Sequence, residues 1–76
     1  MEHLNPTNVL PYAQRLYDNG SREDILRFLQ WNDPNGVYTD KASDDEGYDR
    51  LTYDEALLEL EGVINELQLD LEVVKV

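Results

Sequence analysis

The stretch that decides the fold is TYDEALLELEGVINELQLDLEVVKV, residues 52–76. Thr52 at its start and Glu55 three residues later form the capping-box pattern that begins a helix. Apolar residues then recur at alternating steps of four and three, which aligns them in one seam along a helix. The seam consists of Tyr53, Leu57, Leu60, Ile64, Leu67, Leu71 and Val74. The sequence therefore predicts a helix over 53–67 or longer.

The end of this stretch has an alternative interpretation. LQLDLEVVKV (67–76) alternates apolar and polar residues and ends in β-branched ones, which is typical of a strand. Only GVYTD (36–40) could pair with it. We expect the helix to continue, and a minor short β segment is the alternative for residues 68–76.

Two shorter helices are predicted upstream. In NVLPYAQRLYDNG (8–20), Pro11 fits the first turn of a helix over 9–18, and Asn19-Gly20 ends it. In SREDILRFLQW (21–31), Ser21 is a suitable cap for a helix over 22–31. The apolar faces of these two helices contain Leu10, Ala13, Leu16, Tyr17, Ile25, Leu26, Phe28 and Leu29. The prediction is one all-α domain over 1–76, with three helices and a tight corner between the first two.

An acidic loop over 32–51 connects the second and third predicted helices. Its NDPNG segment (32–36) has the residues of a tight turn. Neither Gly36 nor Gly47 aligns with the EF-hand glycine so that oxygen ligands fall at the first and last positions. No metal site is therefore predicted, although a weak, irregular cation site is the alternative for Asp44, Asp45, Glu46 and Asp49.

Charge is the strongest compositional signal. The chain has 17 Asp and Glu against 6 Lys and Arg, a formal net charge of −11. Such a field repels nucleic acid and anionic membranes, so we expect neither as a direct partner, and it attracts basic proteins. The absence of cysteine excludes disulfides and thiolate zinc sites. With no signal-peptide pattern and no apolar run of about 20 residues, we expect a cytoplasmic protein.

The sequence offers little for catalysis. Its one histidine is His3, near the N-terminus, while Ser21 is explained as a cap and Ser43 lies in the acidic loop. Nucleophilic catalysis needs such a hydroxyl beside a base, and no glycine-rich phosphate loop is present. We therefore expect neither an enzyme nor a cofactor.

Aromatic and acidic residues are the candidates for partner binding. Tyr38 and Tyr48 are expected to be exposed contacts, because tyrosine is a frequent interface anchor. On the third predicted helix, Glu55, Glu59 and Glu66 fall within about 60° of arc, away from the seam. The predicted partner-binding residues are Tyr38, Asp40, Asp44, Asp45, Glu46, Tyr48, Asp49, Glu55, Glu59 and Glu66.

These observations favour one functional hypothesis over two others. The first is an acidic inhibitor or regulator that occupies the basic surface of a nucleic-acid-binding protein, as DNA-mimic proteins do. Small, cysteine-free acidic domains of this kind fit a phage or mobile-element origin. The alternatives are a helical adaptor that forms a homodimer through the seam of the third helix, and a weak divalent-cation binder.

Overall fold

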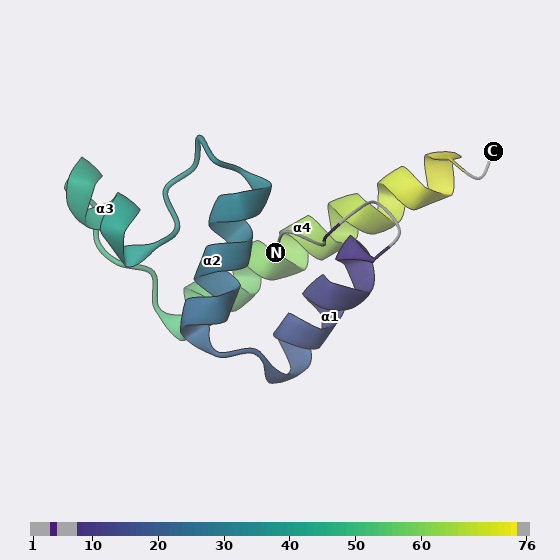
Figure 1. Cartoon of the computed structure of the whole chain (residues 1–76), viewed down its shortest axis with the longest axis horizontal. Helices are drawn as coiled ribbons and strands as arrows, with labels where there is room; N and C mark the ends of the chain where they lie inside the picture. Colours follow the sequence, from purple (N-terminus) through teal and green to yellow (C-terminus); the bar gives the residue numbers. More distant parts are fainter. Residues whose placement is uncertain (1–3, 5–7, 75–76) are drawn as a thin grey trace.

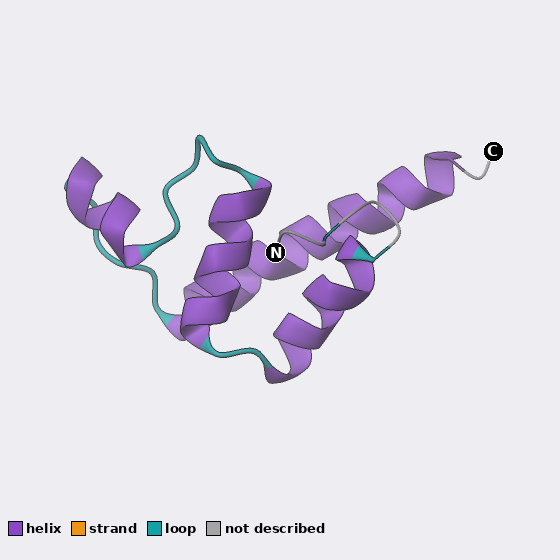
Figure 2. Ribbon diagram, viewed as in Figure 1, coloured by secondary structure: helices purple, strands orange, loops and turns teal. Residues whose placement is uncertain are grey.

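The regular structure of the chain is entirely helical. The computed structural model describes residue 4 and residues 8–74, with side chains described as far as residue 69. Its helices are α1 (Val9–Asn19), α2 (Arg22–Asn32), α3 (Asp40–Glu46) and α4 (Tyr53–Val74). Loops connect them, and the described residues contain no strand (Figures 1 and 2). The predicted all-α fold is confirmed, but α3 was not expected.

The core lies between α1, α2 and α4, which pack against one another. α2 contributes four buried apolar residues because its apolar positions fall on a wide face, as predicted. The Phe28 ring lies 5.7 Å from the Tyr12 ring and 5.8 Å from the Trp31 ring, measured between centroids. The buried core residues are Ala13, Leu16, Ile25, Leu26, Phe28, Leu29, Ala56 and Leu60.

Two predicted helix starts are confirmed by their hydrogen bonds. The Ser21 hydroxyl accepts from the Asp24 amide at 3.2 Å. At the start of α4, the Thr52 hydroxyl accepts from the Glu55 amide at 3.1 Å, and the Glu55 carboxylate accepts from the Thr52 amide at 2.9 Å. These bonds satisfy amides that the helices themselves leave without partners. The sequence therefore fixes where α2 and α4 begin.

α4 is twice as long as either helix that it contacts. Its 22 residues span about 33 Å, against about 16 Å for the 11 residues of α1 or α2. Its C-terminal end extends beyond both of them (Figure 1). The strand interpretation is wrong for residues 68–74, which continue the helix. The segment 36–40 is not a strand either, so the tail has no strand to pair with; residues 75–76 lie outside the described residues.

The middle of the predicted seam packs against the core of the molecule rather than on its surface. Leu60 is fully buried, and Leu57, Ile64 and Leu67 lie partly buried against the core. Tyr53, at the start of the seam, is exposed. The remaining seam positions, Leu71 and Val74, lie beyond the last described side chain.

The predicted acidic loop contains the short helix α3. Its start is capped by the Thr39 hydroxyl, which accepts from the Ala42 amide at 3.2 Å. It ends at Gly47, whose positive φ of 76° is a left-handed conformation that glycine adopts without strain. A capping threonine and a terminating glycine were therefore present in the sequence, seven helical residues apart. The helix between them was not predicted because its residues have no apolar periodicity.

Candidate acidic binding surface

One side chain of α2 organises the first part of the segment that connects α2 to α4. We call residues 33–52 the connecting segment. The Gln30 carbonyl oxygen accepts from the amides of Tyr38 and Thr39 at 3.0 and 3.3 Å. Its NH2 group donates to the carbonyls of Gly36, Asp33 and Pro34 at 2.7, 3.3 and 3.3 Å. Both ends of one amide thus hold the turn in place.

Gly36 allows Tyr38 to fold back onto Asp33. The Tyr38 hydroxyl donates to the Asp33 carboxylate at 3.1 Å. A Cβ atom at residue 36 would lie 2.3 Å from the Tyr38 ring and 2.9 Å from the Asp33 carboxylate. Tyr38 is half-buried against the core, so its ring is not the exposed contact that we predicted. Its hydroxyl instead helps to form an acidic groove, described below.

Arg22 fixes the second part of the connecting segment. Its Nη2 and Nη1 atoms donate to the two carboxylate oxygens of Asp40 at 2.6 and 3.2 Å. Its Nε and Nη2 atoms also donate to the Leu51 carbonyl at 2.9 and 2.6 Å. The planar guanidinium suits this forked geometry. One side chain of α2 therefore holds both the start of α3 and the approach to α4.

Two further basic residues pair with the carboxylates of α3. Arg50 donates to both carboxylate oxygens of Asp44, at 2.6 Å from Nη2 and 3.1 Å from Nε. The Lys41 ammonium donates to Asp45 at 2.8 Å. Arg50 Nη1 also lies 4.0 Å from Asp40. Three carboxylates predicted to meet a partner are therefore already matched by cations of the same chain.

The pKa values of this network shift as expected for such pairs. Hydrogen bonds from Arg22 lower the pKa of the Asp40 carboxyl. Hydrogen bonds from Arg50 similarly lower the pKa of the Asp44 carboxyl. In both cases the cation stabilises the ionised form. The network therefore remains charged and intact at neutral pH.

A groove between the connecting segment and α4 brings together other predicted residues. It has a volume of about 390 Å³, and its lining residues are Asn32, Asp33, Tyr38, Glu59, Gly62, Val63 and Glu66. We call this the acidic groove. Burial raises the pKa of the Tyr38 phenol first, and the hydrogen bond and charge of Asp33 and the charges of Glu59 and Glu66 raise it further. The carboxylates thus lie close enough to act on one phenol.

The described acidic residues of α4 differ from Asp40, Asp44 and Asp45 of α3 because no cation of the described chain pairs with them. Residues 53–69 include five carboxylates and neither lysine nor arginine. Glu55 uses its carboxylate to cap the helix, which leaves its negative charge unmatched. The five are Asp54, Glu55, Glu59, Glu61 and Glu66, and all are exposed.

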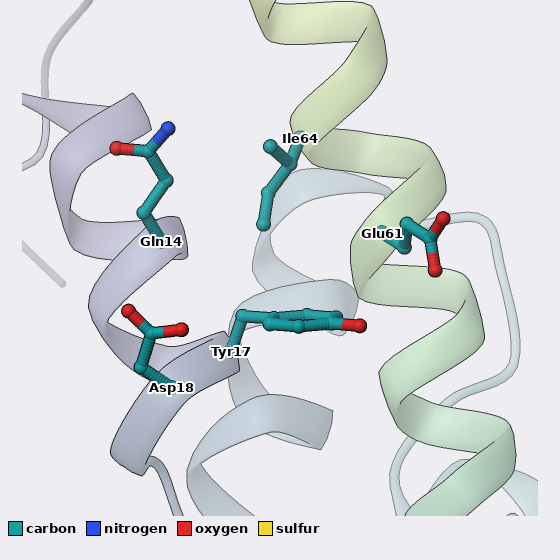
Figure 3. Close-up of a pocket in the computed structure, with 5 residues that line it drawn as sticks. All are labelled: Gln14, Tyr17, Asp18, Glu61 and Ile64. Carbon is teal, nitrogen blue, oxygen red and sulfur yellow. The ribbon is translucent and has the colours of Figure 1, made fainter.

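A second pocket lies on the other side of α4, against α1. Its volume is about 440 Å³, and Figure 3 shows its lining residues. Tyr17 of α1, expected on an apolar face, extends its ring across the gap toward α4, where Ile64 and Glu61 lie (Figure 3). Asp18 adds a further carboxylate at the rim. Acidic residues therefore flank α4 on both sides.

The structure thus divides the ten predicted contact residues into groups. Tyr38, Glu59 and Glu66 meet in the acidic groove. Asp40, Asp44 and Asp45 form internal ion pairs, and Glu55 caps α4. The remaining three residues, near the end of α3, are exposed and give the prediction no geometric support beyond accessibility; they are Glu46, Tyr48 and Asp49.

Sequence reasoning missed Asp33, which lines the groove, and Gln30, which holds the turn beside it. Asp33 was interpreted only as a turn residue, and Gln30 only as a position on a predicted helix. Their spacing to Tyr38 gives no signal, because the contacts depend on how the chain turns back after α2. The one signal in the sequence was Gly36, since a glycine in a polar segment can indicate that another group lies close to the backbone.

The described residues contain no group of three or more His, Cys, Asp or Glu side chains suited to hold a metal ion. None of the described helices has the length and apolar character needed to cross a membrane. Comparison with protein-family models, with curated proteins and with solved structures found no match to this chain. What this surface can bind therefore follows from its own geometry and charge.

Proposed function

We propose that this protein is a non-enzymatic inhibitor or regulator that covers the nucleic-acid-binding surface of a basic protein. One observation carries the proposal: the described carboxylates of α4, within residues 53–69, have no cation to balance them, whereas Asp40, Asp44 and Asp45 of α3 do. Exposed charges of one sign attract a surface of the other sign and repel similar ones. The partner surface is therefore rich in lysine and arginine.

The acidic groove supports a more specific contact. Asp33, Glu59 and Glu66 line one hollow, together with the Tyr38 phenol. A lysine or arginine side chain inserted there would meet several carboxylate acceptors at once. Charge-assisted hydrogen bonds of this kind are stronger than neutral ones. The groove would thus anchor a partner that the wider acidic surface attracts.

The spacing of the carboxylates is compatible with a substitute for nucleic acid, although it is sparser. Glu55 and Glu59 are separated by about 6 Å along the helix axis, and Glu59 and Glu66 by about 10 Å. One DNA strand carries a charge about every 3.4 Å. Asp54 and Glu61 form a second row on the other side of α4. Two rows together resemble the two charged edges of a duplex.

Competition with DNA tests this function. The partner would first be isolated with the protein as bait from a native lysate, then purified. We expect duplex DNA and this protein to exclude each other from the partner. We also expect the complex of this protein with the partner to weaken steeply as salt rises. If the partner binds both at once with unchanged affinities, mimicry of nucleic acid is wrong.

A matched pair of variants locates the contact. Glu59→Gln/Glu66→Gln and Asp44→Asn/Asp45→Asn each remove two negative charges. We expect the first variant to weaken partner binding more, because its carboxylates are unpaired, whereas Asp44 and Asp45 already have cationic partners. Equal losses would show that net charge alone, rather than the acidic groove, determines binding.

The homodimer alternative is restricted by the packing of the seam. Leu60 is fully buried within its own chain. A dimer would therefore have to use α4 residues outside the core.

A further inference from the structure

The outward face of α4 carries apolar residues that the fold does not use. Leu58 is 69% exposed and Leu69 is 60% exposed, although both belong to the helix that supplies the core residue Leu60. Gly62 and Asn65 lie between them and are also exposed. The steps between these residues are four, three and four, so they form one line along the helix. We call Leu58, Gly62, Asn65 and Leu69 the outer stripe.

Gly62 is not explained by the packing of this chain. Glycine weakens a helix interior relative to alanine, so its presence needs a reason. A Cβ atom at this position would meet nothing within 4 Å. The fold would therefore accept a side chain here. A missing side chain in the middle of the outer stripe leaves room for a side chain of another helix to insert between Leu58 and Leu69, as a knob inserts into a hole.

Charge determines which helix can dock there. Glu55, Glu59 and Glu66 lie along one side of the outer stripe, and Asp54 and Glu61 along the other. Two copies of α4 facing each other would bring carboxylate against carboxylate. Like charges across an interface are unfavourable, so a second copy does not suit this face. A helix with basic residues on both sides of its own apolar seam matches both the leucines and the carboxylates.

We propose that the outer stripe docks an amphipathic helix of a partner, with lysine or arginine flanking the apolar seam of that helix. This inference rests on the proposed function and adds the structural element through which the basic partner is bound. The partner helix places apolar side chains on Leu58 and Leu69 and a bulky one over Gly62. Asn65 offers a polar contact that favours one register over the others.

Three synthetic three-heptad peptides test the inference without any nucleic-acid-binding protein. The first has a leucine seam flanked by lysine, the second is a scrambled form of the first, and the third has the same seam flanked by glutamate. Titration calorimetry at physiological salt would compare their binding to the full chain. We expect the first to bind about tenfold more tightly than the scrambled form, because apolar anchors add to the charge attraction, and the third not to bind.

Variants of the stripe show where the peptide binds. Leu58→Asn/Leu69→Asn should lose the tenfold preference and lower the melting temperature only slightly, because both side chains are exposed and the loss is limited to helix propensity. Gly62→Leu should fold at least as well as the wild type and also bind the first peptide more weakly, because its side chain fills the hole. Since Gly62 also lines the acidic groove, the leucine pair is the variant that separates the outer stripe from the groove. Tyr48→Asn removes an equally exposed apolar side chain elsewhere and should have no effect.

Several results would overturn the inference. Equal binding of the first peptide and its scrambled form would mean that charge alone acts. Unchanged binding by the Leu58→Asn/Leu69→Asn variant would place the site elsewhere. Sedimentation of the wild type as a dimer that this variant abolishes would identify a second copy as the occupant. Failure of DNA competition, with the peptide results intact, would remove the proposed function but leave a helix-docking site.

Discussion

The three-helix core and the connecting segment are held together by different physical means. α1, α2 and α4 bury apolar side chains against one another, with Phe28 and Leu60 fully enclosed. The connecting segment adds only the partly buried side chains of Tyr38 and Leu51 to this packing, and its helix α3 does not pack against the other helices. It is attached chiefly by polar groups, through the side-chain amide of Gln30 and the guanidinium of Arg22.

This difference shows which part of the molecule should respond to changes in pH and salt. Apolar burial depends little on pH or salt, whereas ion pairs respond to both. The charges of α3 are used to hold α3 in place, while those of α4 lie on a helix that its apolar face already secures. The unpaired carboxylates of residues 53–69 therefore lie on the part of the molecule whose fold does not depend on charge.

The strongest test of the comparison is to remove a core side chain. Leu60→Ala should lower the free energy of unfolding by about 2–5 kcal/mol, because a fully buried leucine leaves a cavity. Leu58→Ala, on the same helix but largely exposed, should change it by only about 0.5 kcal/mol. Chemical denaturation followed by circular dichroism would measure both. Similar losses from the two variants would refute the assigned orientation of α4.

A smaller effect is expected from Gln30, which joins the two regions. Gln30→Ala should lower the free energy of unfolding by about 1–3 kcal/mol, because several backbone groups of residues 33–39 lose their hydrogen-bond partner. Gln30→Glu keeps an acceptor for the Tyr38 amide but brings a carboxylate oxygen toward the Gly36 carbonyl, so it should also destabilise. Amide hydrogen exchange should rise over 33–39 and stay slow in Ile25. Gln14→Ala, at an exposed site, is the control; uniform acceleration across the chain would contradict a local role.

Acid should separate the two regions further. The folded pKa values of Asp40 and Asp44 are lowered by their arginine partners, so their contribution to stability is present above the unfolded value of about 3.9. It is lost as pH falls from there through the folded values. Amide chemical shifts of Ala42 and Gly47 should therefore change with acid before that of Phe28 does.

The variant Asp40→Asn/Asp44→Asn provides the control for the acid titration. Its α3 should be loosened already at neutral pH, and acid should alter it little further. If Ala42 and Phe28 report the same midpoint in the wild type, the two regions unfold as one unit and the comparison fails.

The smallest effect concerns Tyr38, at the border of the two regions. Burial and the hydrogen bond to Asp33 raise the pKa of its phenol above the ordinary value of about 10. Because the folded value is the higher one, its contribution to stability is complete below the unfolded pKa and is lost as pH rises through the folded value. Ultraviolet titration should show a phenolate component at high pH that Tyr38→Phe removes and Tyr48→Phe retains. A high-pH component that survives Tyr38→Phe would contradict the partial burial and hydrogen bond assigned to Tyr38.

How far the sequence could predict the structure follows the same division. The core helices could be predicted because their signals are local. Ser21 and Thr52 cap the first turns of their helices, and Leu60 belongs to a regular apolar repeat. α3 was missed because its seven residues have no apolar repeat and depend on Thr39 and Gly47 at their ends.

The candidate site was less predictable than the fold. Glu59 and Glu66 could be placed on one face by counting residues. The pairing of Asp40 with Arg22 could not be predicted by counting, because the two residues are 18 positions apart. They meet only because the chain turns back after α2, along a path that Gln30 holds in place. Charge counting alone therefore overstated how many acids of the connecting segment are free to bind a partner.

The position of Arg50 outside the helices also has a consequence for proteolysis. Among the described residues outside the helices, Arg50 is the one basic residue, so the Arg50–Leu51 bond is where trypsin meets non-helical backbone after a basic side chain. Cleavage there separates α1, α2 and α3 from α4 without touching a buried core residue. The two fragments still share one apolar core and would stay associated after the cut. We therefore expect this bond to be the place at which the chain can be divided and reassembled from two separately produced pieces.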